Sequence, residues 1–199
     1  MKLRQLLTAP NQLTMLRMLF LPFIVMNLVD DDYRITLGLF VLAGLSDGLD
    51  GLLARRLHQQ TLLGQYLDPI ADKLLLSTMF LVLSAMHKIP WRYTALVFGR
   101  DMSILAASAV LYAIAGLRDF SPSIFGKANT FSQVSAVFFV LLFEVVHLRG
   151  IWIARTAFLW ATSAFTIISG VHYVFLAQHR MRLLGHAAHA GPPSSKQVA

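Results

Sequence analysis

The sequence predicts an all-α, polytopic membrane protein with six transmembrane helices and a short N-terminal interfacial helix. Its 199 residues are 56% hydrophobic and only 14% charged, whereas a soluble domain carries about 25% charged residues. The mean hydropathy is +0.62, and a chain of this length cannot hide so much apolar surface in one water-facing core. Long apolar runs alternate with short polar segments. Together these observations exclude an ordinary soluble domain and a disordered chain.

Cysteine is absent from the sequence, which excludes disulfides, a cysteine zinc site, an iron–sulfur cluster and a thiol nucleophile. The formal net charge is +7, but the basic residues are scattered and form no basic helix face. We therefore expect contact with anionic membrane lipids and no nucleic-acid partner.

Residues 1–12 alternate basic residues with leucine, which predicts the interfacial helix, and Asn11 is a suitable N-cap for the first span. A span needs about 20 mostly apolar residues. The segments that meet this requirement are approximately residues 12–29, 35–57, 69–87, 92–115, 124–147 and 151–177. Trp91 and Trp152 stand near expected span ends, where aromatic rings favour the membrane interface.

The distribution of Lys and Arg predicts the orientation. With the N-terminus in the cytoplasm, that side carries Lys2, Arg4, Arg55, Arg56, Arg118, Arg180, Arg182 and Lys196, and the other side carries Arg34, Lys88, Arg92 and Arg149. We expect an integral protein of a bacterial-type inner membrane, with both termini and the active site on the cytoplasmic side. Residues 1–180 form one transmembrane domain in this interpretation, and residues 181–199 form a disordered cytoplasmic tail.

Ionisable residues inside predicted spans are functional candidates, because a charge at the centre of a membrane helix costs about 2.5–3.5 kcal/mol on insertion scales. Asp47 and Asp50 lie in the second span, and Asp68 and Asp72 lie at the start of the third, with Asp68 expected to cap the helix before Pro69. Further ionisable residues in or beside the spans are Arg17, Lys73, Arg100, Asp101, Lys127 and Glu144.

The four aspartates form two pairs, three and four residues apart, and each pair shares one helix face. A short connection containing Gly64 lets the two spans lie antiparallel, so the pairs converge. Four adjacent carboxylates need cations to stay ionised, and Mg²⁺ with phosphate oxygens is the usual solution. The alternative, structural salt bridges with neighbouring basic residues, stays open for Asp101 and is disfavoured for the quartet.

The spacing of these aspartates with small and basic residues resembles the signature of the CDP-alcohol phosphatidyltransferase family. The signature positions are filled by Asp47, Asp50, Gly51, Ala54, Arg55, Gly64, Asp68 and Asp72. The segments PNQLTMLR at 10–17, FGRD at 98–101 and FGKANT at 125–130 resemble further family landmarks. The resemblance covers about residues 9–178, and six transmembrane helices are also the family architecture.

The resemblance implies that a CDP-linked lipid, usually CDP-diacylglycerol, is attacked by an acceptor hydroxyl and releases CMP. It implies that Asp47, Asp50 and Asp68 hold divalent cations, two ions of Mg²⁺ or Mn²⁺, and that Asp72 assists with the second ion and serves as general base. Gly51, Ala54 and Gly64 are then expected to line the nucleotide pocket, and Arg55 to meet the pyrophosphate or cytidine. Members of the family are often homodimers, although the sequence identifies no interface.

Arg100 and Lys127 are expected to bind a phosphate on the acceptor, which favours glycerol 3-phosphate and a phosphatidylglycerophosphate product. The alternative for Arg100 is simple neutralisation of an aspartate. A rival acceptor is phosphatidylglycerol, because the run at 37–51, Asp101 and FGKANT also resemble cardiolipin synthases of this family. A divalent-cation or proton-coupled transporter is disfavoured, since the carboxylates cluster near one side and no inverted repeat is visible.

Overall fold

The computed structural model describes the backbone of residues 9–56, 62–115 and 124–189 and the side chains of residues 15–46, 71–103 and 126–171. Within these residues the chain forms six helices and no strand, which confirms the all-α prediction. The helices are α1 (Ala9–Val29), α2 (Tyr33–Arg56), α3 (Leu62–Ala85), α4 (Trp91–Ala115), α5 (Ile124–Val145) and α6 (Arg149–His189).

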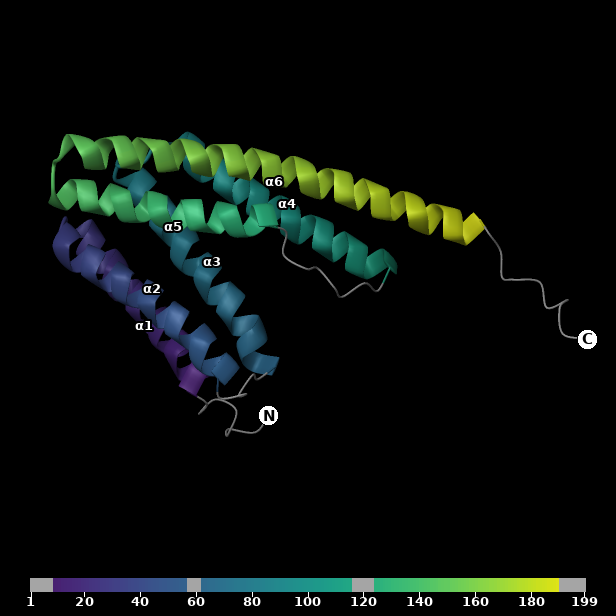
Figure 1. Cartoon of the computed structure of the whole chain (residues 1–199), viewed down its shortest axis with the longest axis horizontal. Coiled ribbons are helices and arrows are strands. Elements are labelled where there is room, and N and C mark those ends of the chain that lie inside the picture. Colours follow the sequence, from purple (N-terminus) through teal and green to yellow (C-terminus); the bar gives the residue numbers. More distant parts are fainter. Residues whose placement is uncertain (1–8, 57–61, 116–123, 190–199) are drawn as a thin grey trace, which may run out of the picture.

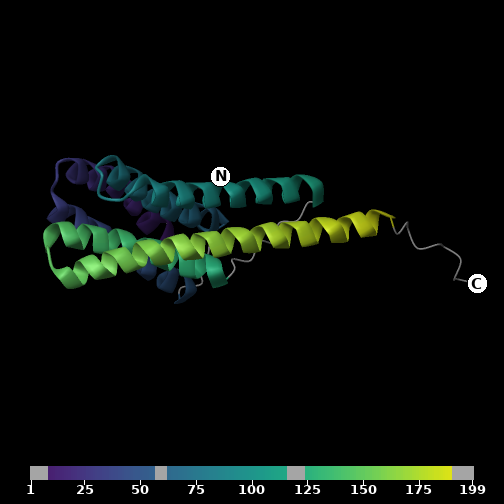
Figure 2. The ribbon, with the colours of Figure 1, turned by 90° about the horizontal axis from the view of Figure 1, so that it is seen from above.

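The six helices pack as two hairpins bridged by two further helices (Figure 1). Helices α1 and α2 form one hairpin, and α5 and α6 form the other. Helix α3 contacts α1, α4 and α5, and α4 packs along α6, so these two helices connect the hairpins. In Figure 2, α4 and α6 extend together beyond the rest of the bundle. The 41 residues of α6 give it a length of about 60 Å.

The turn between α1 and α2 is compact because one residue adopts a left-handed conformation. Asp31 has φ 61°, its N–H donates to the Leu28 carbonyl over 3.2 Å, and the N–H of Asp32 donates to the Asn27 carbonyl over 2.9 Å. This is the Schellman pattern that ends many helices. The Asp32 carboxylate then accepts the N–H of Ile35 over 3.3 Å and caps α2, so Asp32 both ends one helix and starts the next.

Helix α3 ends in the same way without a glycine. His87 has φ 58°, its N–H donates to the Ser84 carbonyl over 3.0 Å, and the N–H of Lys88 donates to the Leu83 carbonyl over 2.8 Å. Asp and His are among the residues that tolerate positive φ. Both turns lie at the same end of the bundle as the 146–148 connection between α5 and α6 (Figure 1).

The apolar core fills the half of the bundle nearest these short turns. Its members share near-complete burial and come from every helix: Ile24, Leu28, Phe40, Ala43, Leu75, Leu76, Met79, Phe80, Leu83, Ile89, Tyr93, Val97, Ala136, Val137, Val140, Leu141 and Leu159. Burial of each large apolar side chain contributes about 1.5–3 kcal/mol relative to exposure in water. This half therefore acts as the rigid base from which the helices reach toward the opposite, more polar end.

Two predicted helix starts are wrong by several residues. Helix α1 begins at Ala9, so Asn11 lies inside the helix; Pro10 is accommodated because a first-turn residue needs no N–H partner. The predicted interfacial helix falls mainly on residues 1–8, which lie outside the described residues. Helix α3 begins at Leu62, so Asp68 does not cap it and Pro69 lies beyond its first turn. Leu and Gln are good helix formers, and the helix starts as soon as they appear.

Helix α6 continues beyond its predicted end. It runs to His189, so residues 181–189, predicted to be disordered, are helical. The segment contains two Leu, two Ala, one Met and one Arg, which all favour helix. The rest of the predicted tail, residues 190–199, lies outside the described residues.

Two helices of the described part are long and apolar enough to cross a membrane. The segments are Gly126–Val145 and Arg149–Val171, and Met15–Val29 and Tyr33–Ser46 are shorter apolar segments. The prediction of six transmembrane helices is thus matched in the number of described helices, while membrane crossing is supported by composition for two of them.

A cluster of polar contacts joins the three short turns. The ammonium group of Lys88 lies 2.8 Å from the Glu144 carboxylate and 5.0 Å from the centre of the Tyr33 ring. Arg155 donates to the Lys88 carbonyl and lies 5.3 Å from the centre of the Phe143 ring. The hydrogen bond with Glu144 raises the pKa of Lys88 above its ordinary value of 10.5. This cluster links the starts of α2 and α6 to the end of α5.

We predict that Glu144→Gln lowers the stability of the bundle by about 1–2 kcal/mol, or roughly 2–8 °C in melting temperature. The substitution removes the negative partner of Lys88 while keeping the side-chain shape. Because the pKa of Lys88 is raised in the folded state, the ion pair stabilises below pH 10.5 and its contribution is lost as the pH rises through the higher folded pKa.

Thermal unfolding in detergent at neutral and strongly alkaline pH tests this, with Asp30→Asn, an exposed acid at the same end, as control. Equal melting temperatures for Glu144→Gln and the wild-type chain at neutral pH contradict the prediction.

Candidate functional site

The four signature aspartates stand on two consecutive helices that meet at one end of the bundle. Asp47 and Asp50 belong to α2, and Asp68 and Asp72 belong to α3. Only residues 57–61 separate the two helices, so the end of α2 and the start of α3 must lie close together, as they do at the lower end of Figure 1. This end is opposite the short turns and the apolar core.

The positions of the aspartates along these helices match in pairs. At 1.5 Å per residue, Asp50 and Asp68 each stand about 9 Å from the end of α2 and the start of α3, and Asp47 and Asp72 each stand about 14–15 Å from those points. The antiparallel direction of α2 and α3 brings each pair to one level. The side chains of Asp47, Asp50 and Asp68 lie outside the described residues, so a shared carboxylate site stays a prediction for them.

The described member of the quartet, Asp72, is held by an arginine from the first helix. The guanidinium of Arg17 donates to the Asp72 carboxylate, with the Arg17 side chain 2% exposed and that of Asp72 41% exposed. Burial of the arginine makes this contact a fixed feature of the α1–α3 interface, since an arginine without a counter-charge is costly there. The half-open carboxylate remains reachable by small ligands.

A cavity of about 90 Å³ lies against Asp72 and Arg17. Its remaining walls come from α2, α3 and α5 and are mostly apolar: Phe40, Ala43, Gly44, Leu75, Leu76, Thr130 and Val134. The volume is enough for several water-sized species, since one needs about 10–15 Å³ by this kind of measure. Asp72 therefore faces a space in which small hydrophilic species fit beside apolar walls.

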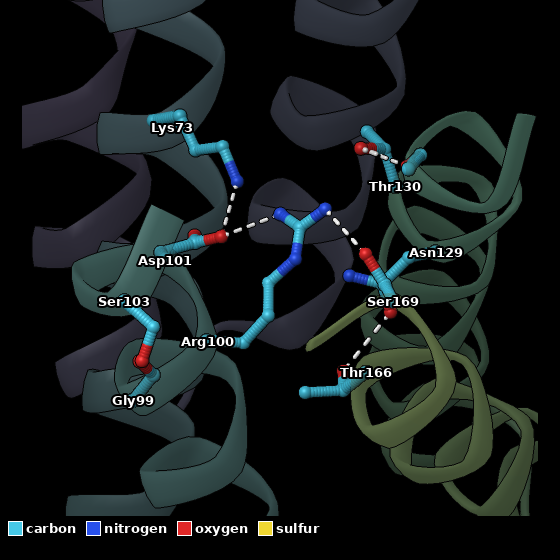
Figure 3. A network of polar contacts seen from close by, with 10 residues as sticks. Lys73, Gly99, Arg100, Asp101, Ser103, Asn129, Thr130, Thr166 and Ser169 are labelled. Atoms are coloured by element: carbon cyan, nitrogen blue, oxygen red, sulfur yellow. Dashed lines mark hydrogen bonds and ion pairs between the residues drawn. The ribbon is translucent and has the colours of Figure 1, made fainter. Parts of the chain in front are cut away.

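A second polar network begins one residue after Asp72. The ammonium of Lys73 lies 2.6 Å from the Asp101 carboxylate, and the Arg100 guanidinium lies 2.7 Å from the same oxygen (Figure 3). A second nitrogen of Arg100 donates to the Ser169 hydroxyl over 3.1 Å. The network thus joins α3, α4 and α6 through side chains, and Arg100 and Asp101 are both buried.

The sequence left open whether Asp101 forms a structural salt bridge, and the structure shows its carboxylate paired with Lys73 and Arg100. It shows equally that neutralisation does not account for all of the positive charge, because Lys73 and Arg100 share one carboxylate. The network carries one excess positive charge next to Asp72. In addition, the Nε atom of Arg100 is buried and has no hydrogen-bond partner among the described residues. An anionic ligand would compensate both.

Where the structure describes side chains, it shows no hydrogen bond or ion pair between the remaining predicted site residues and Asp72 or Arg100. Lys127 is exposed on the first turn of α5 and makes no hydrogen bond or ion pair with the described side chains. Helix α2 carries Gly51, Ala54 and Arg55, and α3 carries Gly64, but their side chains lie outside the described residues. Among the described side chains, which include Asp72 but not the other three aspartates, no three acidic or histidine residues form a metal-binding group.

The sequence analysis did not predict the polar contacts between α5 and α6, and it disfavoured salt bridges for the aspartate quartet, whereas the structure shows one between Asp72 and Arg17. Thr166 donates to the Asn129 side-chain oxygen over 3.0 Å, and Ser169 contacts Arg100. A usable signal was present: Thr162, Thr166 and Ser169 recur at helical spacing along one face of an apolar helix. Arg17 was recognised as an intramembrane charge, but its partner depends on helix rotation that a single sequence does not specify.

A family model described as CDP-alcohol phosphatidyltransferase matches residues 7–168. The chain is 33% identical over 184 residues to the human protein named cardiolipin synthase (CMP-forming). The alignment covers 80% of this chain and 60% of the human protein. The chain thus spans about 60% of the length of the human and rat cardiolipin synthases it matches.

Two bacterial relatives match over nearly their whole length. The chain is 30% identical to the CDP-diacylglycerol--glycerol-3-phosphate 3-phosphatidyltransferase of Bacillus subtilis, over 82% of this chain and 92% of that protein. It is 33% identical to the protein of the same name from Sodalis glossinidius, over 87% of this chain and 96% of that protein.

We predict that Arg17 and Asp72 couple energetically. Arg17→Met leaves the Asp72 carboxylate without this partner and should destabilise the chain by about 1.5–3 kcal/mol. Adding Asp72→Asn removes the negative charge that Arg17 balanced, so the double variant should recover part of this loss. A double-mutant cycle measured by unfolding in detergent should give an interaction free energy of about 0.5–3 kcal/mol. Strictly additive effects would show that the contact does not stabilise the α1–α3 interface.

Proposed function

The chain belongs to the CDP-alcohol phosphatidyltransferase family, and from this premise we propose that it transfers a phosphatidyl group from CDP-diacylglycerol to an alcohol acceptor. The proposal rests on the positions of the four aspartates along the antiparallel helices α2 and α3. Asp50 stands at about the same height in the bundle as Asp68, and Asp47 at about the same height as Asp72. Asp72 adds a reachable carboxylate beside a small cavity. The names of the matched relatives describe reactions of this class.

The proposed reaction exchanges one phosphorus–oxygen bond for another. The acceptor hydroxyl oxygen attacks the phosphorus that carries the diacylglycerol, the bond from this phosphorus to the CMP oxygen breaks, and the hydroxyl proton passes to Asp72. The ion pair with Arg17 holds the Asp72 carboxylate in one orientation for this transfer. Arg55, with Gly51, Ala54 and Gly64, is assigned to the CDP group by family resemblance. Positioning and electrostatics supply most of the acceleration.

We propose that Asp47, Asp50, Asp68 and Asp72 hold divalent cations, two ions of Mg²⁺ or Mn²⁺. The residues fit this role, because carboxylates are the oxygen ligands these ions prefer. The half-exposed Asp72 borders a cavity with room for water-sized species, and Mg²⁺ usually keeps several waters. When bound, such cations neutralise charge on the diphosphate and make CMP a better leaving group.

The favoured acceptor is glycerol 3-phosphate, which gives phosphatidylglycerophosphate. The support is the excess positive charge of the Lys73–Asp101–Arg100 network one residue from Asp72, which suits a small anionic acceptor. Lys127 contributes a further positive charge from the first turn of α5. Phosphatidylglycerol is the second candidate, because it also carries a phosphate and because the chain resembles human cardiolipin synthase.

We propose that all six helices lie in the membrane, with the aspartates and both termini at the cytoplasmic face. Large apolar side chains are exposed around the bundle, among them Leu19, Phe23, Met26, Leu45, Phe131, Trp160 and Ile167, and such a surface suits lipid. Trp91 and Trp152, each 51% exposed, begin α4 and α6 at the short-turn end, where an aromatic belt would lie. The excess of Lys and Arg toward the aspartate end supports the orientation.

We predict that the purified chain in detergent releases CMP from CDP-diacylglycerol in the presence of Mg²⁺ and glycerol 3-phosphate. Chelation by EDTA should abolish the release, and Mg²⁺ should restore it. A parallel reaction with phosphatidylglycerol identifies the second candidate, since release in that tube alone makes the chain a cardiolipin synthase. Release that survives EDTA contradicts the metal assignment, and no release with either acceptor contradicts the proposed substrates.

We predict that Asp72→Asn lowers kcat by about 10²–10⁴-fold, the usual contribution of a general base, while CDP-diacylglycerol still binds. Asp31→Asn, at the opposite end of the bundle, is the matched control and should keep wild-type rates. Initial rates together with equilibrium binding of the CDP-lipid separate the two effects. A kcat within a few-fold of wild type would remove Asp72 from the proton-transfer step.

A further inference from the structure

A ladder of buried polar side chains runs along the interface between α5 and α6. The hydrogen bond of 3.0 Å between Asn129 and Thr166 fixes the register of these antiparallel helices. In this register Gly126 stands level with Ser169, and Gln133 stands level with Thr162. The five polar side chains are at most 3% exposed. Polar groups so deep in an apolar bundle require hydrogen-bond partners.

Several atoms of this ladder lack such partners among the described residues. They are the side-chain amide nitrogens of Asn129 and Gln133 and the Thr162 hydroxyl. Thr166 donates to the side-chain oxygen of Asn129. The amide nitrogen of Asn129 therefore points away from Thr166. The amide N–H groups can only donate, and what is missing is therefore an acceptor.

The unsatisfied nitrogen of Asn129 and the unsatisfied Nε of Arg100 belong to the same region. In Figure 3 the Asn129 amide nitrogen points toward the Arg100 side chain, which enters from α4 between Asp101 and Ser169. Ser169, which accepts from Arg100, and Thr166, which donates to Asn129, stand one turn apart on α6, so the two donors come from neighbouring side chains. The adjoining Lys73–Asp101–Arg100 network has one excess positive charge. An oxygen atom with negative charge satisfies both donors and the charge.

We propose that Asn129 is a specificity-determining residue that shares an anionic phosphate oxygen of the acceptor with Nε of Arg100. Thr166 is its positioning residue, because its hydroxyl holds the Asn129 oxygen and turns the amide nitrogen toward the phosphate. This inference rests on the proposed function. The ligand chemistry is a glycerol-linked phosphate, supplied either as the free monoester of glycerol 3-phosphate or as the diester of phosphatidylglycerol.

The site lies at a suitable place relative to the reacting groups. Thr130, which follows Asn129 on α5, lines the same cavity as Asp72, and Lys73, which follows Asp72 on α3, forms an ion pair with Asp101 of the Arg100 network. A glycerol whose hydroxyl reaches Asp72 can thus place its phosphate toward α4, α5 and α6. The amide is neutral, so it adds a directed donor where a third cation would oppose Arg100 and Lys73.

The decisive variant is Asn129→Asp, which keeps the shape and the oxygen that accepts from Thr166 but replaces the donor by a negative oxygen. It should raise the KM of the acceptor by about 10- to 100-fold, the range for losing a hydrogen bond to a charged group. The KM of CDP-diacylglycerol should stay within about twofold of wild type. Thr166→Val, which removes only the orienting hydroxyl, should raise the acceptor KM by a smaller factor and leave kcat near wild type.

The control is Ser163→Ala, because the Ser163 hydroxyl bonds the Leu159 carbonyl of its own helix and takes no part in the ladder. Rates are measured with glycerol 3-phosphate and with phosphatidylglycerol in mixed micelles. Binding of glycerol 3-phosphate is also measured by titration calorimetry without CDP-diacylglycerol, which needs no turnover. Asn129→Ala replaces Asn129→Asp if the latter fails to fold.

A raised KM in the glycerol 3-phosphate arm alone supports the site and identifies the free monoester as its ligand. A raised KM in the phosphatidylglycerol arm alone supports the site and identifies the lipid headgroup. If wild-type chain turns over but Asn129→Asp keeps its acceptor KM within about twofold, or changes only the melting temperature, the amide holds a structural water and the inference is wrong. Absence of CMP release by the wild-type chain contradicts the proposed function instead, so the two failures are distinguishable.

Discussion

Charges inside the helical bundle are paired across helix interfaces, and this pairing determines how the helices are held together. Arg17 on α1 contacts Asp72 on α3, Lys73 on α3 contacts Asp101 on α4, and Arg100 on α4 contacts Ser169 on α6. The chain of contacts follows the packing order from one hairpin to the other. Arg17, Arg100 and Asp101 are buried, and each of them would be strongly destabilising without a partner, so the contacts restrict helix rotation as well as position.

Among the described side chains, the bundle has an apolar half toward the short turns and a polar half that holds Arg17, Asp72, Lys73, Arg100 and Asp101. Short turns close the apolar half, where left-handed Asp31 and His87 end their helices within a few residues and Lys88 joins Glu144. The polar half begins at the level of Asp72 and Arg100. Because the same helices run through both halves, the well-packed core positions the ionisable groups in the other half, as preorganised electrostatic catalysis requires.

Hydropathy was enough to predict the number of helices, since each apolar run is long and is separated from the next by polar residues. Helix ends were predicted less well, because Pro10 and Pro69 suggested starts near them while the flanking residues also favour helix. The signature aspartates were recognisable from spacing alone. Their environment was not: the contacts of Arg17 with Asp72 and of Asn129 with Thr166 depend on how each helix is rotated, and a single sequence contains little information on rotation.

The Arg100 network shows why two interpretations of one residue need not compete. If Arg100 only neutralised Asp101, the pair would be complete without Lys73. A second cation on the same oxygen would then add repulsion between the two positive charges and no compensating contact. If Arg100 only bound a ligand, Asp101 would weaken that binding by competing for the guanidinium. With both cations on one carboxylate, Asp101 orients Arg100 while Lys73 restores the positive charge that Asp101 removes. The resulting group keeps a fixed geometry and one net positive charge, the combination that selective recognition of a single phosphate requires.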